Sequence, residues 1–419
     1  MKINFENASF KDFENIPGLD PFSWAELWSE YVDYKTQRGQ MNYRFEAQTG
    51  CGPEISLKVP GITQTDFISL VSNDYLGFTQ HPKVKAAAIA GVEKYGSGAG
   101  ASPAIGGHYD YHTELEMKIA AFFKREVALT FTTGYTANSA SIQALLKKED
   151  LAILDMAVHA SVQEGCFLTN TKSFPHNDLD ALERILKMSK NKYRTRMVII
   201  DGVYSQDGDL APLDKIIQLT KHYGAYLLVD DAHGTGVIGK TGRGVIELYD
   251  LFNEVDIITG TFSKTFAHIG GYVVADPKLV SFLKFQSRQH IFSATATPAS
   301  ACISTAIDLI DQEPFWMEKL QQNIAYLKSG LLSLGLDIGK SQSAIIPVMI
   351  GNNNKNAEIC HLLLKAGVYT NQINYPAVSR KDARIRMSIM ATHEFDQLDK
   401  VLNAWEWVIK TAGLKQILR

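Results

Sequence analysis

The lysine most able to do chemistry is Lys264, which lies in the segment Asp256–Gly271. There a short apolar strand is followed by a turn, the lysine, and a run of small residues that ends in Gly270 and Gly271. An amine that is partly desolvated, or that lies near another positive charge, can form a Schiff base with an aldehyde. A solvated lysine after a strand would show the same local pattern, so the residues around Lys264 must distinguish the two interpretations.

Polar residues also follow three other predicted strands. They are His159 after Leu151–Leu154, Ser205 after Met197–Asp201, and Asp230 and His233 at the end of Ala225–Asp230. In an open, mainly parallel sheet, ligands bind outside the carboxyl ends of the strands, so we expect these side chains to share one crevice with Lys264. An aspartate there could keep a pyridine nitrogen protonated, and an imidazole could stack on the ring or bond its phenolic oxygen.

A candidate phosphate site follows the predicted strand Val127–Phe131. The next residues, TTGYTAN, lead into a helix that runs to Leu146. A strand followed by a small-residue turn and a helix start presents backbone N–H groups and a positive dipole end to an anion. The phosphate cradle would consist of Thr132, Thr133, Gly134 and Tyr135. Together, these features describe a site for pyridoxal phosphate.

The elements that must position this site alternate between strand and helix, which predicts an α/β fold with a mainly parallel, doubly wound sheet. A chain of 419 residues exceeds one hydrophobic core, so we expect more than one lobe. We divide the chain into an N-terminal segment of helix and short β structure (1–75), a large cofactor-binding domain (76–305) and a smaller α+β domain (306–419). Within the N-terminal segment, the helical stripe around Trp24, Trp28 and Tyr31 indicates packing and not chemistry.

Composition and charge exclude several classes of protein. The net charge of −3 gives no bulk attraction to nucleic acid, and no His/Cys cluster has metal-ligand spacing. The run with Gly96, Gly98 and Gly100 follows a helix, whereas a dinucleotide fingerprint follows a strand. Four scattered cysteines and the absence of a signal-peptide pattern or a long apolar run indicate a cytoplasmic protein without a transmembrane segment. Peripheral contact with a membrane stays open.

Several sequence blocks carry a family resemblance. GTFSK, VDDAHG, DGVYSQDGD, VHAS, NDYLG and RMSIMATHE resemble the blocks of α-oxoamine synthases, which are fold-type I pyridoxal phosphate enzymes related to aminotransferases. The resemblance extends from about Asp66 to Lys410. It implies pyridoxal 5'-phosphate as cofactor, no metal, and a homodimer whose active sites lie between the two subunits.

The resemblance also assigns a role to each candidate residue. Lys264 would form the Schiff base and later remove the α-proton of the substrate. Asp230 would pair with the pyridine nitrogen, and His159 would stack on the ring. The remaining assignments are His233 and Ser205 beside the phenolic oxygen, Gly134, Tyr135, Thr261 and Ser263 on the phosphate, Thr295 reaching the phosphate from the partner subunit, and Arg386 with Asn73 on the substrate carboxylate.

The implied reaction is a decarboxylating condensation of an amino acid with an acyl thioester, carried by coenzyme A or by acyl carrier protein, to an aminoketone. The segments ATATPAS and SIMATHEFDQLDKVL look most similar to the bacterial serine palmitoyltransferase branch, which serves sphingolipid synthesis. Residues 103–108 and 376–379 depart from that branch near the expected substrate. Alternatives are therefore a cysteate acyltransferase of sulfonolipid synthesis, with His108 and Arg384 as sulfonate donors, 8-amino-7-oxononanoate synthase, 2-amino-3-ketobutyrate ligase, an aminotransferase, or a non-catalytic binding module.

Overall fold

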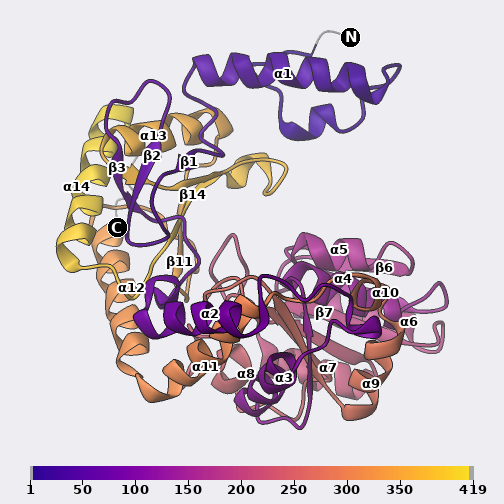
Figure 1. Cartoon of the computed structure of the whole chain (residues 1–419). Helices are drawn as coiled ribbons and strands as arrows, with labels where there is room; N and C mark the ends of the chain where they lie inside the picture. Colours follow the sequence, from indigo (N-terminus) through magenta and orange to yellow (C-terminus); the bar gives the residue numbers. More distant parts are fainter. Residues whose placement is uncertain (1–2, 415–419) are drawn as a thin grey trace. The chain divides into compact units, whose positions relative to one another are not determined.

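The computed structural model describes residues 3–414 (Figure 1). The remaining terminal residues, which we assign from sequence to the N-terminal segment and the C-terminal domain, lie outside the described residues. The chain divides into two compact units. Unit 1 contains the residues up to Ser72, the short segment Gln206–Gly208, and the residues from Gln321 onward; unit 2 contains Asn73–Ser205 and Asp209–Leu320.

Unit 2 is built on a seven-stranded sheet with the strand order β4-β10-β9-β8-β7-β5-β6. The strands from β9 to β6 pair in parallel, and β10 is antiparallel to both β9 and β4. The central strands are buried apolar runs, as expected for a parallel sheet covered on both faces. Their bounds are β4 (Ala128–Phe131), β5 (Leu151–Asp155), β6 (Asn170–Phe174), β7 (Arg196–Asp201), β8 (Tyr226–Asp230), β9 (Ile257–Thr261) and β10 (Gly271–Ala275).

The helices of unit 2 begin and end at residues with recognisable capping chemistry. The Asp178 carboxylate accepts a hydrogen bond from Ala181 N at the start of α6, and Gly224 ends α7 in the left-handed conformation that glycine adopts without strain. The helices are α2 (Pro82–Tyr95), α3 (Asp110–Phe122), α4 (Gly134–Leu145), α5 (Ala160–Gly165), α6 (Leu179–Ser189), α7 (Leu213–Tyr223), α8 (Gly244–Leu248), α9 (Pro277–Gln286), α10 (Arg288–Phe292) and α11 (Cys302–Gln312), with 3-10 turns at Phe78–Gln80, Pro103–Ile105 and Pro298–Ala301.

The predicted fold class is confirmed, with two local corrections. The strand β6 was not predicted, because its residues NTKSF are polar and four of the five are exposed. The sequence predicts a helix over Thr113–Phe123. The helix begins earlier, at Asp110, because Tyr109 N donates to His112 Nδ1 at 3.0 Å and caps an earlier first turn. Neither change moves the strand ends on which the predicted site depends.

Unit 1 combines two small sheets with four longer helices. One sheet has the order β1-β2-β3-β12 and the other β11-β14-β13. The strands are β1 (Glu46–Ala47), β2 (Glu54–Lys58), β3 (Asp66–Ser69), β11 (Ile345–Met349), β12 (Val368–Tyr369), β13 (Asn371–Ile373) and β14 (Arg384–Ser388). The helices are α1 (Pro21–Gln37), α13 (Asn353–Lys365), α14 (Phe395–Ala412) and α12 (Phe315–Ser333), within which the division between the units falls, and 3-10 turns lie at Phe10–Phe13 and Arg380–Asp382.

Segments from the N-terminal and C-terminal parts of the chain pair with each other in unit 1. Strand β3, from the N-terminal part, pairs in parallel with β12, from the C-terminal part, and Ser388 N donates to Leu70 O at 2.7 Å. The aromatic stripe of α1 packs on the preceding turn, with the ring centroids of Phe13 and Tyr31 separated by 4.7 Å. The N-terminal segment is thus part of unit 1, and its helical stripe serves packing.

Within residues 3–414, no helix has both the length and the apolar character needed to cross a membrane.

Candidate active site

The predicted site residues of unit 2 follow neighbouring strands of one sheet. Asp201 of β7 pairs in register with Asp230 of β8, and Asp230 pairs with Thr259 of β9. The carboxyl ends of these parallel strands therefore lie at one edge of the sheet. That edge carries His159 beyond β5, Ser205 beyond β7, Asp230 and His233 at the end of β8, and Thr261, Ser263 and Lys264 at the end of β9.

Asp230 is buried, and both of its carboxylate oxygens accept hydrogen bonds. Asn138 Nδ2 lies 2.6 Å from Oδ2, and Ala232 N lies 3.0 Å from Oδ1. These two donors fix the plane of the carboxylate. Such a carboxylate is suited to hold a proton on a ring nitrogen facing it, as the resemblance to α-oxoamine synthases predicts.

The neighbouring Asp231 has a different role, because successive residues of a strand point to opposite faces. Its carboxylate is fully buried and accepts from Val245 N at 2.8 Å. A Cβ atom on Gly244 would approach Asp231 Oδ2 to 1.8 Å, so the backbone passes directly against this carboxylate. Burial raises the pKa of Asp231 to about 7. Asp231 therefore anchors the segment behind β8, and Asp230 is the one available for chemistry.

His159 is the N-cap residue of α5, and its ring is held by Ser161. Its Nδ1 lies 2.8 Å from Ser161 Oγ and accepts from Ser161 N at 3.3 Å. Although the residue has an exposed face, the surrounding protein desolvates the imidazole and lowers its pKa, as does the Lys264 charge, while the Asp230 charge acts in the opposite direction. The charges of Lys264 and Asp230 thus both act on a ring that is neutral at neutral pH.

The carboxyl of Asp201 also belongs to this charge cluster. It is buried, it accepts a long hydrogen bond of 3.4 Å from His159 N, and its pKa is raised well above the ordinary value, first by burial and then by the Asp230 charge. Burial and the nearby negative charge both disfavour the ionised form of Asp201. The sequence shows Asp201 only as the last residue of a strand.

His233 is held by Tyr75, from the NDYLG block. A hydrogen bond of 2.6 Å joins Tyr75 Oη to His233 Nδ1, and both side chains are buried. Tyr75 Oη also donates to Asn73 Oδ1 at 3.3 Å. The phenol therefore connects a predicted cofactor residue with a predicted substrate residue. Asp74 instead makes the turn predicted for this block, accepting from Phe78 N and Thr79 N.

The predicted phosphate cradle lies where α4 begins. A Cβ atom on Gly134 would approach Thr261 Cβ to 2.6 Å, so only glycine lets the helix start lie against the end of β9. Thr261 Oγ1 donates to Gly270 O at 2.9 Å and accepts from Ser263 N at 3.1 Å. The first-turn N–H groups of a helix lack intrahelical acceptors, and those of α4 lie beside these hydroxyls. The arrangement fits a phosphate group.

Three further predicted residues have contacts of their own within their units. Tyr135 directs its hydroxyl to Glu164, although its ring lies 6.0 Å from that of His159. Thr295 donates to Gly107 O at 2.7 Å and shares a small cavity with Thr132 and His290. Arg386 is buried in β14 of unit 1, where its Nη1 donates to Ser388 Oγ at 2.9 Å. Their contacts with phosphate or substrate stay predictions, as does that of Ser205, which is partly buried.

Sequence reasoning missed three residues that hold the predicted ones. Asn138 bonds Asp230, Ser161 bonds His159, and Tyr75 bonds His233. Asn138 ends the TTGYTAN block and Tyr75 stands inside NDYLG, so both lie in quoted blocks but were not assigned a role. Only the three-dimensional contact identifies them.

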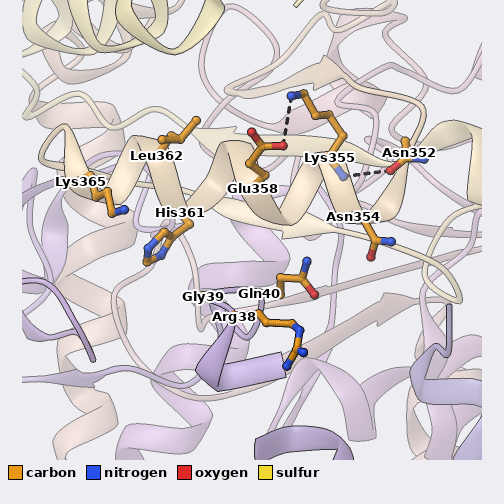
Figure 2. Close-up of a pocket in the computed structure, with 10 residues that line it drawn as sticks. All are labelled: Arg38, Gly39, Gln40, Asn352, Asn354, Lys355, Glu358, His361, Leu362 and Lys365. Atoms are coloured by element: carbon orange, nitrogen blue, oxygen red, sulfur yellow. Dashed lines mark hydrogen bonds and ion pairs between the residues drawn. The ribbon is translucent and has the colours of Figure 1, made fainter. Parts of the chain in front are cut away.

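A cavity of about 620 Å³ lies in unit 1, between the end of α1 and the face of α13 (Figure 2). Arg38, Gln40, His361 and Lys365 line it, and Lys355 is paired there with Glu358 at 3.1 Å. None of the predicted site residues is among its lining residues. Among the described residues 3–414, no three His, Cys, Asp or Glu side chains could hold a metal ion.

Comparison with known proteins agrees with this geometry. The family model for aminotransferase class I and II matches residues 65–404. The 8-amino-7-oxononanoate synthase 1 of Bacillus velezensis is 42% identical over 96% of this chain and 98% of its own, and that of Bacillus subtilis is 41% identical over 87% and 93%.

A structure of serine palmitoyltransferase from S. paucimobilis, in a lysine-to-alanine variant with a bound PLP–myriocin aldimine, is 31% identical. It superimposes with a TM-score of 0.89 over 94% of this chain and 100% of its own. The residues at the sheet edge fit pyridoxal phosphate. The 8-amino-7-oxononanoate synthases and serine palmitoyltransferase are pyridoxal phosphate enzymes as well. The chain belongs to the aminotransferase class I and II family and, within it, to the α-oxoamine synthases, pyridoxal phosphate-dependent acyltransferases that join an amino acid to an acyl thioester.

Proposed function

We propose that the chain condenses a small amino acid with a neutral side chain, serine first, with a long-chain acyl thioester. Carbon dioxide and the free thiol leave, and the product is an aminoketone of the 3-oxosphinganine type. The observation that carries this proposal is the Asp230, His159 and Lys264 charge cluster beside the start of α4, together with the structural likeness to serine palmitoyltransferase.

Each residue of the cluster has one task in the proposed reaction. Pyridoxal phosphate, when bound, supplies an electron sink for negative charge at the α-carbon of the amino acid. Lys264 Nζ would hold the cofactor and take the α-proton, Asp230 would keep the pyridine nitrogen protonated, and the neutral His159 ring would stack on the cofactor ring. The helix start at Gly134 and Tyr135, with Thr261 and Ser263, would hold the phosphate, and His233 and Ser205 would bond the phenolic oxygen.

Two residues are proposed to contact the substrate. Arg386, assisted by Asn73, binds the carboxylate of the amino acid. Thr295 reaches the phosphate in the second subunit of a homodimer. A dimer is checked by light scattering, which should give twice the mass of 46.5 kDa.

The contacts of Arg384 argue against a sulfonate side chain on the substrate. Its guanidinium is ion-paired with Asp207 and donates from Nε to Asp382 O at 2.8 Å. His108, the other donor considered for cysteate, is exposed and its Nε2 lies 3.0 Å from Thr113 Oγ1. A guanidinium already neutralised by a carboxylate gains little from a second anion. Serine therefore ranks before cysteate.

A second candidate function is 8-amino-7-oxononanoate synthesis, which the 42% identity to proteins of that name favours. The amine and ketone of that product are on adjacent carbons of an acid chain. Such a product forms from alanine and a seven-carbon dicarboxylic acyl thioester. The two candidates share every residue of the cluster and differ only in the amino acid and the acyl chain.

One assay series separates these possibilities. Purified holoenzyme is incubated with serine, alanine, glycine or cysteate, and with palmitoyl or dicarboxylic acyl groups carried by coenzyme A or by acyl carrier protein. Thiol release together with carbon dioxide supports a synthase, and the best pair of substrates names it. Selective turnover of alanine with the dicarboxylic acyl group would replace the serine proposal, whereas keto-acid formation without thiol release would indicate an aminotransferase.

A further inference from the structure

Asn138 lies at the centre of a buried hydrogen-bond network in unit 2. Its side chain is 2% exposed, and it projects from α4 toward the ends of β8 and β9. Its Nδ2 is 2.6 Å from Asp230 Oδ2 and 3.0 Å from Ser161 Oγ, and its Oδ1 accepts from Thr259 Oγ1 at 2.6 Å. One amide thus contacts three polar side chains on three elements.

The direction of each hydrogen bond in this network is determined. The amide has two N–H donors, one for the Asp230 carboxylate and one for Ser161 Oγ. The reversed amide would place its oxygen against the carboxylate oxygen of Asp230, which is unfavourable. Thr259, which is fully buried, can then only donate to Asn138 Oδ1. Thr259 therefore locks the amide in the orientation that serves Asp230.

The second branch of the network ends at His159. Because Ser161 Oγ accepts from Asn138, its own hydroxyl proton is available for His159 Nδ1 at 2.8 Å. Ser161 N also donates to the same nitrogen, at 3.3 Å. Two donors on Nδ1 place the ring proton of the neutral imidazole on Nε2. The tautomer and the orientation of His159 are thus set from Asn138.

We propose that Asn138 is a positioning residue that orients both Asp230 and His159 toward the cofactor ring, so that one amide aligns the ring-nitrogen partner and the ring-face partner together. The inference rests on the proposed roles of Asp230 and His159. It adds that one side chain orients both residues. The hydrogen bond from Asn138 to Asp230 and the one to Ser161 can be removed separately by mutation.

The chemistry of the site explains why this position requires an amide. An apolar residue would leave the buried Asp230 Oδ2 without its donor. An aspartate would place a second carboxylate about where Nδ2 now lies, next to that of Asp230, and one of the two would take a proton. Only an amide offers two donors and one acceptor in this geometry without adding charge.

The test compares Asn138→Ala with Ser161→Ala and with a matched control, Ser141→Ala. Ser141 is also buried in α4, and its hydroxyl has no hydrogen-bond partner among the described residues. The dissociation constant of pyridoxal phosphate is measured by equilibrium dialysis, and the visible band of the bound cofactor is titrated with pH. The Nδ1 and Nε2 signals of His159 are followed by NMR with labelled histidine, assigned with His159→Gln.

Asn138→Ala should weaken cofactor binding by about tenfold or more, because a hydrogen bond to a buried charged group is lost, and should shift the pH titration of the visible band. Ser161→Ala should keep cofactor affinity within about threefold, as expected for the branch that does not touch Asp230, and should alter the His159 nitrogen signals. Ser141→Ala should match the wild type in every measurement.

Wild-type affinity and an unchanged band titration in Asn138→Ala would overturn the inference, and the cofactor assignment would still stand if Lys264→Ala lost the band. The absence of any band in wild-type holoenzyme would instead refute the proposed function. If Asn138→Ala does not fold, Asn138→Asp decides, because it keeps the size of the side chain and replaces the donor to Asp230 Oδ2 by a second carboxylate. Weakened binding in that variant supports the inference, and unchanged binding overturns it.

Discussion

His159 and His176 follow neighbouring strands, β5 and β6, of the same sheet, and their surroundings move their pKa values in opposite directions. Burial lowers the pKa of His159, and the charge of Lys264 adds to that effect. Burial also acts to lower the pKa of His176, but its Nδ1 and Nε2 lie 3.1 Å from Asp155 and 2.9 Å from Asp209, and the two carboxylates raise its pKa to about 10.

The opposite pKa shifts distinguish a histidine available for catalysis from one that stabilises the fold at the edge of this sheet. His176 is a cation at neutral pH and ties the end of β5 to the loop after β7, where Tyr204 N donates to Asp209 O at 3.1 Å. His159 is a neutral ring with one nitrogen occupied by Ser161. Position after a strand is common to both, so the partners of the ring, and not its position, indicate its function.

Lys264→Ala, which removes the charge beside His159, should have the largest effect on turnover. Without Nζ the cofactor loses its attachment and the substrate loses its base, so turnover should fall by at least about a thousandfold. The visible band of the purified protein should disappear as well. Absorbance and thiol-release assays measure both, with the exposed Lys278→Ala as control. Normal turnover in Lys264→Ala would show that the charge beside His159 is not catalytic.

Asp230→Asn should have the next largest effect. The amide cannot supply the negative charge that keeps the ring nitrogen protonated, so we expect a loss of kcat of about a hundredfold. Cofactor affinity should fall less than kcat, since the phosphate contacts remain. The neighbouring Asp231→Asn provides the contrast, because its side chain faces Val245 and not the site. Equal losses of kcat in both variants would argue against an electron-sink role for Asp230 alone.

The sequence was sufficient to predict the fold class and the order of the strands that carry the site, although β5 and β9 end slightly later than predicted, at Asp155 and Thr261. The apolar runs of β5, β7, β8 and β9 are bounded by polar residues, and the order of the blocks places His159, Asp230 and Lys264 at one edge. What could not be predicted are contacts between elements distant in the chain. Asn138 and Asp230 are separated by 92 positions, and Tyr75 and His233 by 158.

Two further features could not be predicted from the sequence: a polar strand at the surface, and the pairing of segments that are distant in the chain. Strand β6 lacks the apolar alternation that indicates a strand, because its outer residues face solvent. The parallel pairing of β3 with β12 joins segments that we had assigned to different domains, and nothing local to either strand encodes it. The tip Gln206–Gly208 of the loop after β7 similarly groups with unit 1, where Arg384 pairs with Asp207.

His176→Gln should destabilise the protein and leave the chemistry intact. Removing the cation leaves the buried Asp155 carboxylate uncompensated, so we expect a loss of about 2–4 kcal/mol in the free energy of unfolding. Cofactor affinity and kcat should change by less than about threefold, since neither carboxylate contacts the site. Urea unfolding and dialysis measure the two quantities. A large loss of kcat in a well-folded variant would remove the distinction between the two histidines.

The pH dependence of this loss has a definite sign. Because the folded-state pKa of His176, about 10, lies above that of an unfolded histidine, about 6.5, its stabilisation is fully present below pH 6.5 and is lost as the pH rises through 10. The difference between wild type and His176→Gln should therefore be greatest below pH 6.5 and should shrink toward pH 10. A difference that grows in the alkaline range would contradict the ion triad.

The smallest expected effect concerns His233, which is an intermediate case between the two histidines. It is buried, and a phenol, Tyr75, lies 2.6 Å from its Nδ1. Tyr75→Phe removes this hydrogen bond without changing the volume of the ring. We expect kcat to fall by about threefold to tenfold, the usual cost of one neutral hydrogen bond, with the cofactor band retained.

The same substitution probes the substrate contact, because Tyr75 Oη also bonds Asn73 Oδ1. If the phenol positions only His233, KM for the amino acid should stay constant while kcat falls. If it positions Asn73 as well, KM should rise together with the loss of kcat. Unchanged kcat and KM in Tyr75→Phe would mean that the Tyr75 hydroxyl positions neither His233 nor Asn73. A steady-state measurement on the variant, with Tyr43→Phe in unit 1 as a control hydroxyl that bonds Gln372 O at 3.0 Å, distinguishes these outcomes.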